Sequence, residues 1–183
     1  MVYVPAALRY RRHGKPHGAI MGWLAAYGAF TPGVEVADNT TVRLDLDNEP
    51  QPDALPHINA DCGGQSRISD DDYVEGAPEL IVEIAASSAA YDLYEKKTVY
   101  RRNGVREYVI WQVTENEISW FSLENGDYQP LLPDGQGIIQ SKVFPGLDLP
   151  ILALLKGDLA TVLTQVQRNI GTERHQRFID QLC

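Results

Sequence analysis

The chain has 183 residues, of which 44% are hydrophobic and 22% are charged, and its formal net charge is −9. This length and composition predict one soluble globular domain. The acidic balance argues against a surface that coats nucleic acid generally, because such binding depends on neutralising phosphates. No apolar run approaches the roughly 20 residues that a membrane span requires, so no membrane partner is expected.

The N-terminal half predicts a helix followed by two short strands. Residues 1–16 show no clear period and are interpreted as an arm. From His17 onward, apolar residues share one face of a helix that ends at Thr31–Gly33. Thr41–Leu46 alternates as a half-buried strand does. Pro52–Ile58 is interpreted as a short strand, which Pro56 would place at a sheet edge or end early.

The centre of the chain predicts a strand, a helix and a second strand. Glu79–Ala86 is an apolar run whose length and Ile/Val content indicate a buried strand. Ser87 and Ser88 are candidate N-caps for a helix over Ala89–Asn103. Arg106–Val113 is rich in β-branched and aromatic residues, so it predicts a second strand. Short joints between these elements indicate a parallel pair of strands with a crossover helix.

The remainder adds a hairpin and helices to this core. Glu117–Leu123 and Asp127–Leu132 flank an Asn–Gly turn, which is typical of a β-hairpin. An amphipathic helix is predicted over Leu155–Ile170, followed by a short helix over about 172–182. The predicted domain therefore spans residues 1–183, with a core over about 17–150 and C-terminal helices over about 151–182. Apolar surface beyond that core, including Trp120 and Phe121, leads us to expect a homodimer.

Two cysteines, Cys62 and Cys183, match neither a disulfide framework nor the spacing of metal ligands. We interpret them as free thiols in a reducing compartment. Basic residues interrupt the N-terminus, so a signal peptide is not expected and a cytoplasmic location is predicted.

Two carboxylates are the strongest candidates for chemistry. Glu83 lies inside the buried run, where a carboxylate needs a partner or a metal. Asp53 lies at the start of the neighbouring predicted strand. Two carboxylates that converge from adjacent strands make the hard-oxygen pocket that Mg²⁺ prefers. A metal held there can polarise a phosphoryl oxygen and activate water.

Three segments resemble the Uma-type family of restriction endonucleases, in the PD-(D/E)XK nuclease superfamily. They are Pro50–Ile58 (PQPDALPHI), Gly76–Ser88 (GAPELIVEIAASS) and Tyr91–Trp111 (YDLYEKKTVYRRNGVREYVIW). The resemblance extends from about His17 to Pro150. It implies an α/β fold with the mixed sheet of restriction endonucleases, and a core of one helix, three strands, a helix and a strand. The same order of elements follows independently from the patterns above.

The resemblance also implies roles for individual residues. Asp53 matches the aspartate of the PD element, and Glu83 matches the acid of the (D/E)XK element. The usual lysine position is Ala85 here, and Lys96 of the following helix matches the family's relocated lysine. Asp53, Glu83 and the backbone carbonyl of Ile84 would then bind Mg²⁺, for which Mn²⁺ can substitute. Lys96 would assist the attacking water in the hydrolysis of DNA.

Several alternatives stay open. Lys96 could pair with Asp92 on the helix surface, which would make Lys97 the alternative lysine. His17 could approach the site or be solvated, and Glu79 could lie behind the metal ligands. Tyr100 is expected to pack in the core, where its hydroxyl needs a partner. His57 with Cys62 is too sparse to indicate a zinc site.

The function also has alternatives. Basic residues cluster over Arg9–Lys15 and over Lys96–Arg106, and these two stretches either contact DNA or are solvated faces. A rival to the nuclease is a non-catalytic oligomeric binding module that retains the fold. Hydrolysis of RNA or of a small phosphodiester would use the same site.

Overall fold

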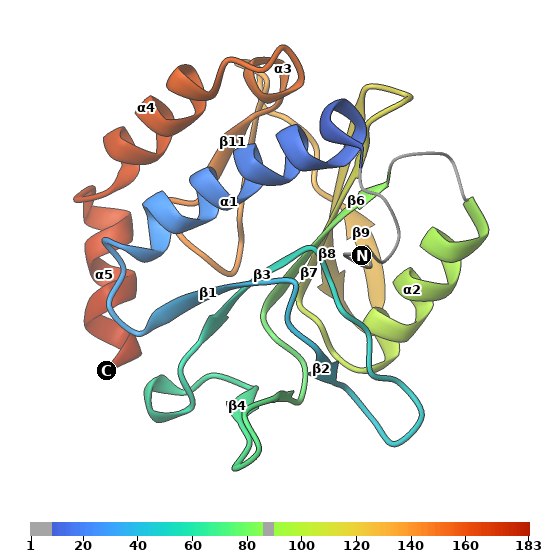
Figure 1. Cartoon of the computed structure of the whole chain (residues 1–183). Coiled ribbons are helices and arrows are strands. Elements are labelled where there is room, and N and C mark those ends of the chain that lie inside the picture. The colour runs from blue at the N-terminus through green and yellow to red at the C-terminus, as the bar shows by residue number, and fades with distance from the viewer. Residues whose placement is uncertain (1–8, 86–89) are drawn as a thin grey trace, which may run out of the picture.

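The computed structural model describes residues 9–85 and 90–183, and it describes no side chains for residues 90–93. A six-stranded mixed sheet lies at the centre, with helices on both faces (Figure 1). Its strands, in spatial order, are β1 (Val34–Asp38), β3 (Ala54–Ile58), β6 (Leu80–Ala85), β7 (Glu107–Gln112), β8 (Glu117–Glu124) and β9 (Asp127–Pro130). β6 and β7 are parallel, and the other neighbouring strands are antiparallel.

The two faces of this sheet carry different helices. One face carries α1 (Lys15–Gly28), α3 (Ile151–Leu155), α4 (Leu159–Asn169) and α5 (Glu173–Leu182). η1 (Tyr10–Gly14) precedes α1 and lies near the start of β3, where His13 contacts Asp53. The other face is covered by α2 (Ala90–Arg102) (Figure 1). Alternation along β6 explains this arrangement, because Val82 and Ile84 pack in one hydrophobic cluster with Trp23 of α1. Ile81 packs in the second cluster with Tyr100 of α2.

Smaller elements complete the chain. β2 (Val42–Arg43), β5 (Val74–Glu75) and β4 (Arg67–Ile68) form a three-stranded sheet. β10 (Ile138–Gln140) pairs with β11 (Asp148–Pro150), and η2 (Ala60–Cys62) is a short 3₁₀ helix after β3. Among the helices of residues 9–85 and 90–183, none is long and apolar enough to cross a membrane.

The predicted α/β class and the order helix, three strands, helix, strand are confirmed, but the first strand was misplaced. The strand that joins the main sheet is β1, where Val34 and Val36 alternate with Glu35. Within Thr41–Leu46, only Val42–Arg43 forms a strand, and it pairs with β5. Asp45 ends that strand because its carboxylate accepts hydrogen bonds from the backbone N–H of Asp47 and the side chain of Asn48.

Pro56 lies on an interior strand, so the predicted edge position is wrong. β3 pairs with β1 along its length but meets β6 in register only at Ala54 opposite Val82. Backbone N–H groups alternate in direction along a strand, so the nitrogens of Pro56 and Ile58 both face β6. At these positions β6 offers no ladder partner. Ile58 N donates instead to Glu79 Oε2 at 2.8 Å, so the side chain of Glu79 bridges the gap where the ladder stops.

The ends of the chain differ from the prediction in two further respects. Tyr10–Gly14 is a turn of π-helix that runs directly into α1, so this part is no separate arm. The predicted single helix over Leu155–Ile170 is divided at Gly157, whose φ is +76°, and α4 begins after the N-cap Asp158. The hairpin and the last helix are confirmed. The predicted caps Ser87 and Ser88 lie outside the described residues.

The interpretation of the cysteines as free thiols is wrong. Cys62 and Cys183 form a disulfide with their Cα atoms 4.8 Å apart, a separation that suits the bond. The 121 residues between them concealed the pairing, because it depends on η2 lying beside the end of α5. Gly33 allows this approach: its φ is +89°, and a Cβ there would lie 3.1 Å from Cys62 Sγ.

Candidate active site

Asp53 and Glu83 lie on the same face of the sheet, the face that α2 covers. Ala54 of β3 pairs with Val82 of β6 in antiparallel register. Extending that register by one residue places Asp53 opposite Glu83, and opposite residues project to the same side. Only 9% of Asp53 and 6% of Glu83 is exposed, so both carboxylates are largely removed from water. Two anions in that situation require compensating partners.

The partners of Glu83 come from α2. Lys96 Nζ donates to Glu83 Oε2 at 2.8 Å, and the hydroxyl of Tyr100 donates to Oε1 at 2.7 Å. Burial raises the pKa of Glu83 above its ordinary value, while the ammonium of Lys96 and the two hydrogen bonds oppose that rise. The negative charge of Asp53 also raises this pKa. The two carboxylates are therefore electrostatically coupled, and added positive charge would stabilise both.

The partners of Asp53 come from β6 and from the N-terminal helical segment. Asp53 Oδ2 accepts from Ile84 N at 2.6 Å, and His13 Nε2 lies 3.3 Å from Oδ1. His17 Nε2 lies 2.9 Å from the carbonyl oxygen of Asp53 and 3.0 Å from Asp38 Oδ1. The rings of His13 and His17 are stacked, with centroids 5.6 Å apart. These contacts fix the start of β3 beside β6.

His13 was missed at the sequence level, where it was grouped with the N-terminal basic residues. A signal existed, because His13 and His17 are four residues apart and so share a helical face. It went unused because the helix was predicted to begin at His17. The approach of His17 itself to the site, which the sequence left open, is what the structure shows.

The two neighbouring lysines of α2 have different surroundings. Lys96 reaches Glu83, whereas Lys97 Nζ lies over the ring of Phe121, 3.4 Å from its centroid. Burial lowers the pKa of Lys97. Tyr100 is wholly buried and packs against Tyr108, which turns this face of α2 toward the sheet. The alternative pairing of Lys96 with Asp92 concerns a side chain outside those that the structure describes.

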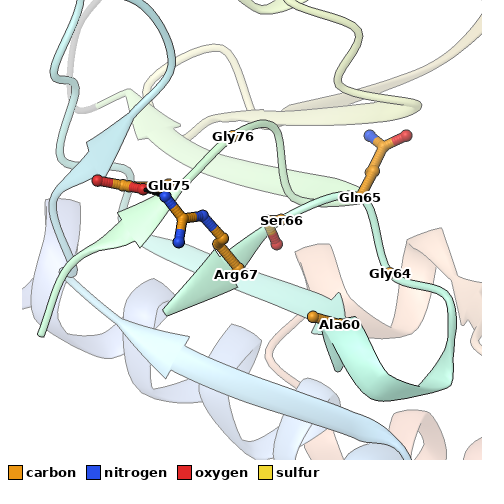
Figure 2. Close-up of a pocket in the computed structure, with 7 residues that line it drawn as sticks. All are labelled: Ala60, Gly64, Gln65, Ser66, Arg67, Glu75 and Gly76. Carbon is orange, nitrogen blue, oxygen red and sulfur yellow. Dashed lines mark ion pairs between the residues drawn. The ribbon is translucent and has the colours of Figure 1, made fainter. Parts of the chain in front are cut away.

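Glu79 and His57 are accounted for by structural contacts. Glu79 accepts from Ile58 N and from Gln65 N at 3.0 Å, so it anchors the loop after η2. That loop lines a separate open cavity of about 410 Å³, in which Arg67 pairs with Glu75 (Figure 2). His57 Nδ1 lies 3.4 Å from Ser66 Oγ, and Cys62 is bonded to Cys183, so both side chains have partners within the chain.

The donors around Asp53 and Glu83 fit Mg²⁺ better than a metal that needs a cage of side chains. No three His, Cys, Asp or Glu side chains within the described ranges gather as a metal centre. Mg²⁺ binds instead through one or two carboxylates, completed by carbonyl oxygens, waters and substrate phosphate. Ile84 directs its N–H toward Asp53. The carbonyl of Ala85 accepts from Val113 N on the β7 side, and carbonyl directions alternate along a strand, so the carbonyl of Ile84 faces Asp53 as well.

Comparisons with known proteins agree with this fold. The sequence model of the Uma2 family, described as "Putative restriction endonuclease", matches residues 2–152, a range that includes Asp53, Glu83 and Lys96. A crystal structure of "a putative nuclease belonging to DUF820" from Anabaena variabilis ATCC 29413 is similar in fold, with a TM-score of 0.62. The similarity covers 85% of this chain and 86% of that one at 9% sequence identity, so it concerns the fold alone. No curated protein matches the chain.

Proposed function

Because the chain belongs to the Uma2 family of "Putative restriction endonuclease" proteins, we propose that it is a Mg²⁺-dependent nuclease that hydrolyses DNA phosphodiester bonds. One observation carries the proposal: Lys96 Nζ, from a helix, lies 2.8 Å from the buried carboxylate of Glu83. A cation delivered from α2 to the strand acid replaces the strand lysine, whose position is Ala85.

Each residue has a distinct task in this proposal. Asp53, Glu83 and the carbonyl of Ile84 would hold Mg²⁺, or Mn²⁺ in its place. The metal would supply Lewis-acid polarisation of the phosphoryl oxygen and a lower pKa for bound water. Lys96 orients the attacking water and stabilises negative charge that develops on the phosphate. Tyr100 fixes the carboxylate of Glu83, and His13 and Ile84 N fix that of Asp53.

The test compares Lys96→Met with Lys97→Met. Loss of one charge-stabilising donor costs about 10²–10³ in rate, so Lys96→Met should reduce Mg²⁺-dependent DNA cleavage by that factor. Lys97→Met should cleave at nearly the wild-type rate, because Lys97 contacts Phe121 and not Glu83. Circular dichroism checks the fold, and Mn²⁺ binding followed by electron paramagnetic resonance checks the metal site. Equal activity in both variants would remove Lys96 from the mechanism.

The rival proposal is a non-catalytic binding module with the same fold. The net charge of −9 and Ala85 at the usual lysine position favour it. Wild-type protein that binds Mn²⁺ between Asp53 and Glu83, yet cleaves no DNA, RNA or small phosphodiester, would support the module. The homodimer also stays a prediction. Trp120, on which it rested, is 1% exposed within the chain, so sedimentation velocity must decide the oligomeric state.

A further inference from the structure

A groove along α2 leads to the Lys96 side of the candidate active site. Its inner part, of about 290 Å³, lies between α2 and the turn at residues 47–50, and Lys96 and Tyr100 line it. Its outer part, of about 500 Å³, is lined by Tyr94 and Thr98. Glu95 and Val99 line both parts, so the two hollows adjoin on the surface of α2. Since Lys96 and Tyr100 both contact Glu83, the inner end of the groove meets the carboxylate site.

The far wall of this groove is fastened to α2. Asp45, just before the turn, accepts from Asn103 Nδ2 at 2.9 Å and from Arg102 at 3.2 Å. Hydrogen bonds from Asn48 and Asn103 hold the pKa of Asp45 well below its usual range. The turn that carries Pro50 is thereby fixed relative to α2. These hydrogen bonds hold both walls of the groove in place, so no movement of the turn is required to form it.

The charges along the groove favour a single phosphate at its inner end and repel a series of phosphates along its length. Lys96 is the single cation among the described residues that line it, and it lies at the inner end. Three carboxylates, those of Asp47, Glu49 and Glu95, line the remainder. A polyphosphate backbone running along the groove would meet these anions, whereas one phosphate beside Lys96 would not.

The basic residues near the end of α2 are committed to this chain's own groups. Arg101 donates to the carbonyl of Gly126 at 2.9 Å, Arg102 contacts Asp45, and Arg106 donates to Gln65 Oε1 at 2.9 Å. They therefore form no free track for the two phosphate backbones of a duplex. The groove itself offers apolar walls at Pro50 and Val99 and, at its outer end, Tyr94, which is 71% exposed.

We propose that this groove holds an unpaired nucleotide, so that the substrate is single-stranded DNA. The inference rests on the proposed nuclease function and narrows its substrate. One phosphate lies beside Lys96, and the attached base lies against Val99 and Pro50. The next base stacks on Tyr94, since every base presents a π-face to an aromatic ring. The rim carboxylates accept hydrogen bonds from amino groups of bases that pairing would otherwise occupy.

Filling the groove tests this proposal. Val99→Trp should reduce kcat/KM for a single-stranded oligonucleotide at least tenfold. Hydrolysis of bis(4-nitrophenyl) phosphate, which carries no nucleotide, should fall by a smaller factor than cleavage of the oligonucleotide in Val99→Trp, and should keep the wild-type rate in Leu152→Trp. Leu152→Trp is the matched control, because Leu152 is 63% exposed on α3, across the sheet from α2. Wild-type protein should cleave the single strand at least tenfold faster than a blunt duplex of the same sequence.

A duplex cleaved as fast as the single strand would overturn the proposal, as would an equal effect of Val99→Trp on both substrates. If the protein hydrolyses neither substrate, the nuclease function fails, and the groove is then tested by binding. Fluorescence anisotropy of a labelled single strand in Ca²⁺ should show at least fivefold weaker binding for Val99→Trp than for Leu152→Trp. Equal binding by the two variants would contradict nucleotide binding in the groove, whether or not the protein is an enzyme.

Discussion

Two buried glutamates on adjacent strands differ in what surrounds them. Glu83 of β6 projects toward α2, where its partners are one ammonium and one hydroxyl. Glu107 of β7 projects to the opposite face, where its four donors are Trp120 Nε1, Ser141 Oγ, Lys142 N and Val143 N. Burial raises the pKa of both carboxyl groups.

The difference separates a carboxylate whose cationic partner is half-exposed from a carboxylate that holds a loop in place. The donors of Glu107 are uncharged, and one of them, the backbone N–H of Lys142, has no other hydrogen-bond partner among the described residues. The carboxylate therefore fixes the loop at residues 141–143, and the loop in turn stabilises the buried carboxylate. The main partner of Glu83 is Lys96, whose side chain is 40% exposed beside the groove and is therefore free to rearrange. A carboxylate whose ammonium partner can move away can bind a metal ion or a water molecule in its place. Glu107 cannot do so without unfolding its loop.

The largest effect should follow from Glu107→Ala. It leaves Trp120 Nε1, Ser141 Oγ and Lys142 N without an acceptor, whereas Val143 N keeps Ser141 Oγ. Each buried unpaired donor costs about 1–3 kcal/mol, so we expect a loss of about 5 kcal/mol of stability. Urea denaturation measures it. Glu83→Gln is the control: its amide oxygen can still accept from the hydroxyl of Tyr100, and the 40% exposed side chain of Lys96 can turn to water, so its loss of stability should be the smaller of the two. Similar losses in the two variants would contradict the distinction.

A disulfide also stabilises the face of the sheet on which Glu107 lies. Arg174 of α5 donates to the carbonyl of Ser141 at 2.8 Å, and the disulfide ties the end of α5 to Cys62. Removing a disulfide that closes a long loop costs about 2–5 kcal/mol, so Cys183→Ser should lower stability by about 3 kcal/mol. Urea denaturation with and without a dithiol reductant checks it. The reductant should have no further effect on the variant, and a wild-type protein insensitive to reduction would refute the expectation.

The sequence predicted more of the Glu83 face than of the Glu107 face. Asp53, Glu83 and Lys96 are local signals: a charge inside an apolar strand, a carboxylate beside Pro52 and a lysine on the following helix. Glu107 also begins an apolar strand, but its partners lie 13 to 36 residues further along the chain. The disulfide and His13 depended likewise on how distant segments pack. The predicted edge position of Pro56 is wrong because the side chain of Glu79 bridges the gap between β3 and β6, and no local sequence pattern predicts that contact.

The pH dependence of stability should distinguish the two carboxyl groups. A carboxyl group whose pKa is raised in the folded state binds its proton more tightly there. Its contribution to stability therefore falls as pH rises from the ordinary value of 4.5 through the raised pKa. Lys96→Met removes the cation that opposes this rise, so the pKa of Glu83 should increase further and the fall should steepen. Carboxyl-carbon NMR should show Glu83 shifting while Glu107 does not. An unchanged Glu83 pKa would show that Lys96 has little electrostatic influence on it.

The smallest effect should follow from Tyr108→Phe, on the α2 face close to Glu83. The hydroxyl of Tyr108 is buried and has no hydrogen-bond partner within the described part of the chain, although Tyr100 and Tyr128 pack beside its ring. Removing an unpaired buried hydroxyl forfeits no hydrogen bond, so stability should change by less than about 0.5 kcal/mol or increase. Tyr100→Phe is the matched control, because that hydroxyl donates to Glu83 at 2.7 Å. Its loss should cost about 1–3 kcal/mol, the range for hydrogen bonds to charged groups. Urea denaturation of both variants at pH 7 makes the comparison. A larger loss for Tyr108→Phe than for Tyr100→Phe would mean that Tyr108, and not Tyr100, supports the charge of the site.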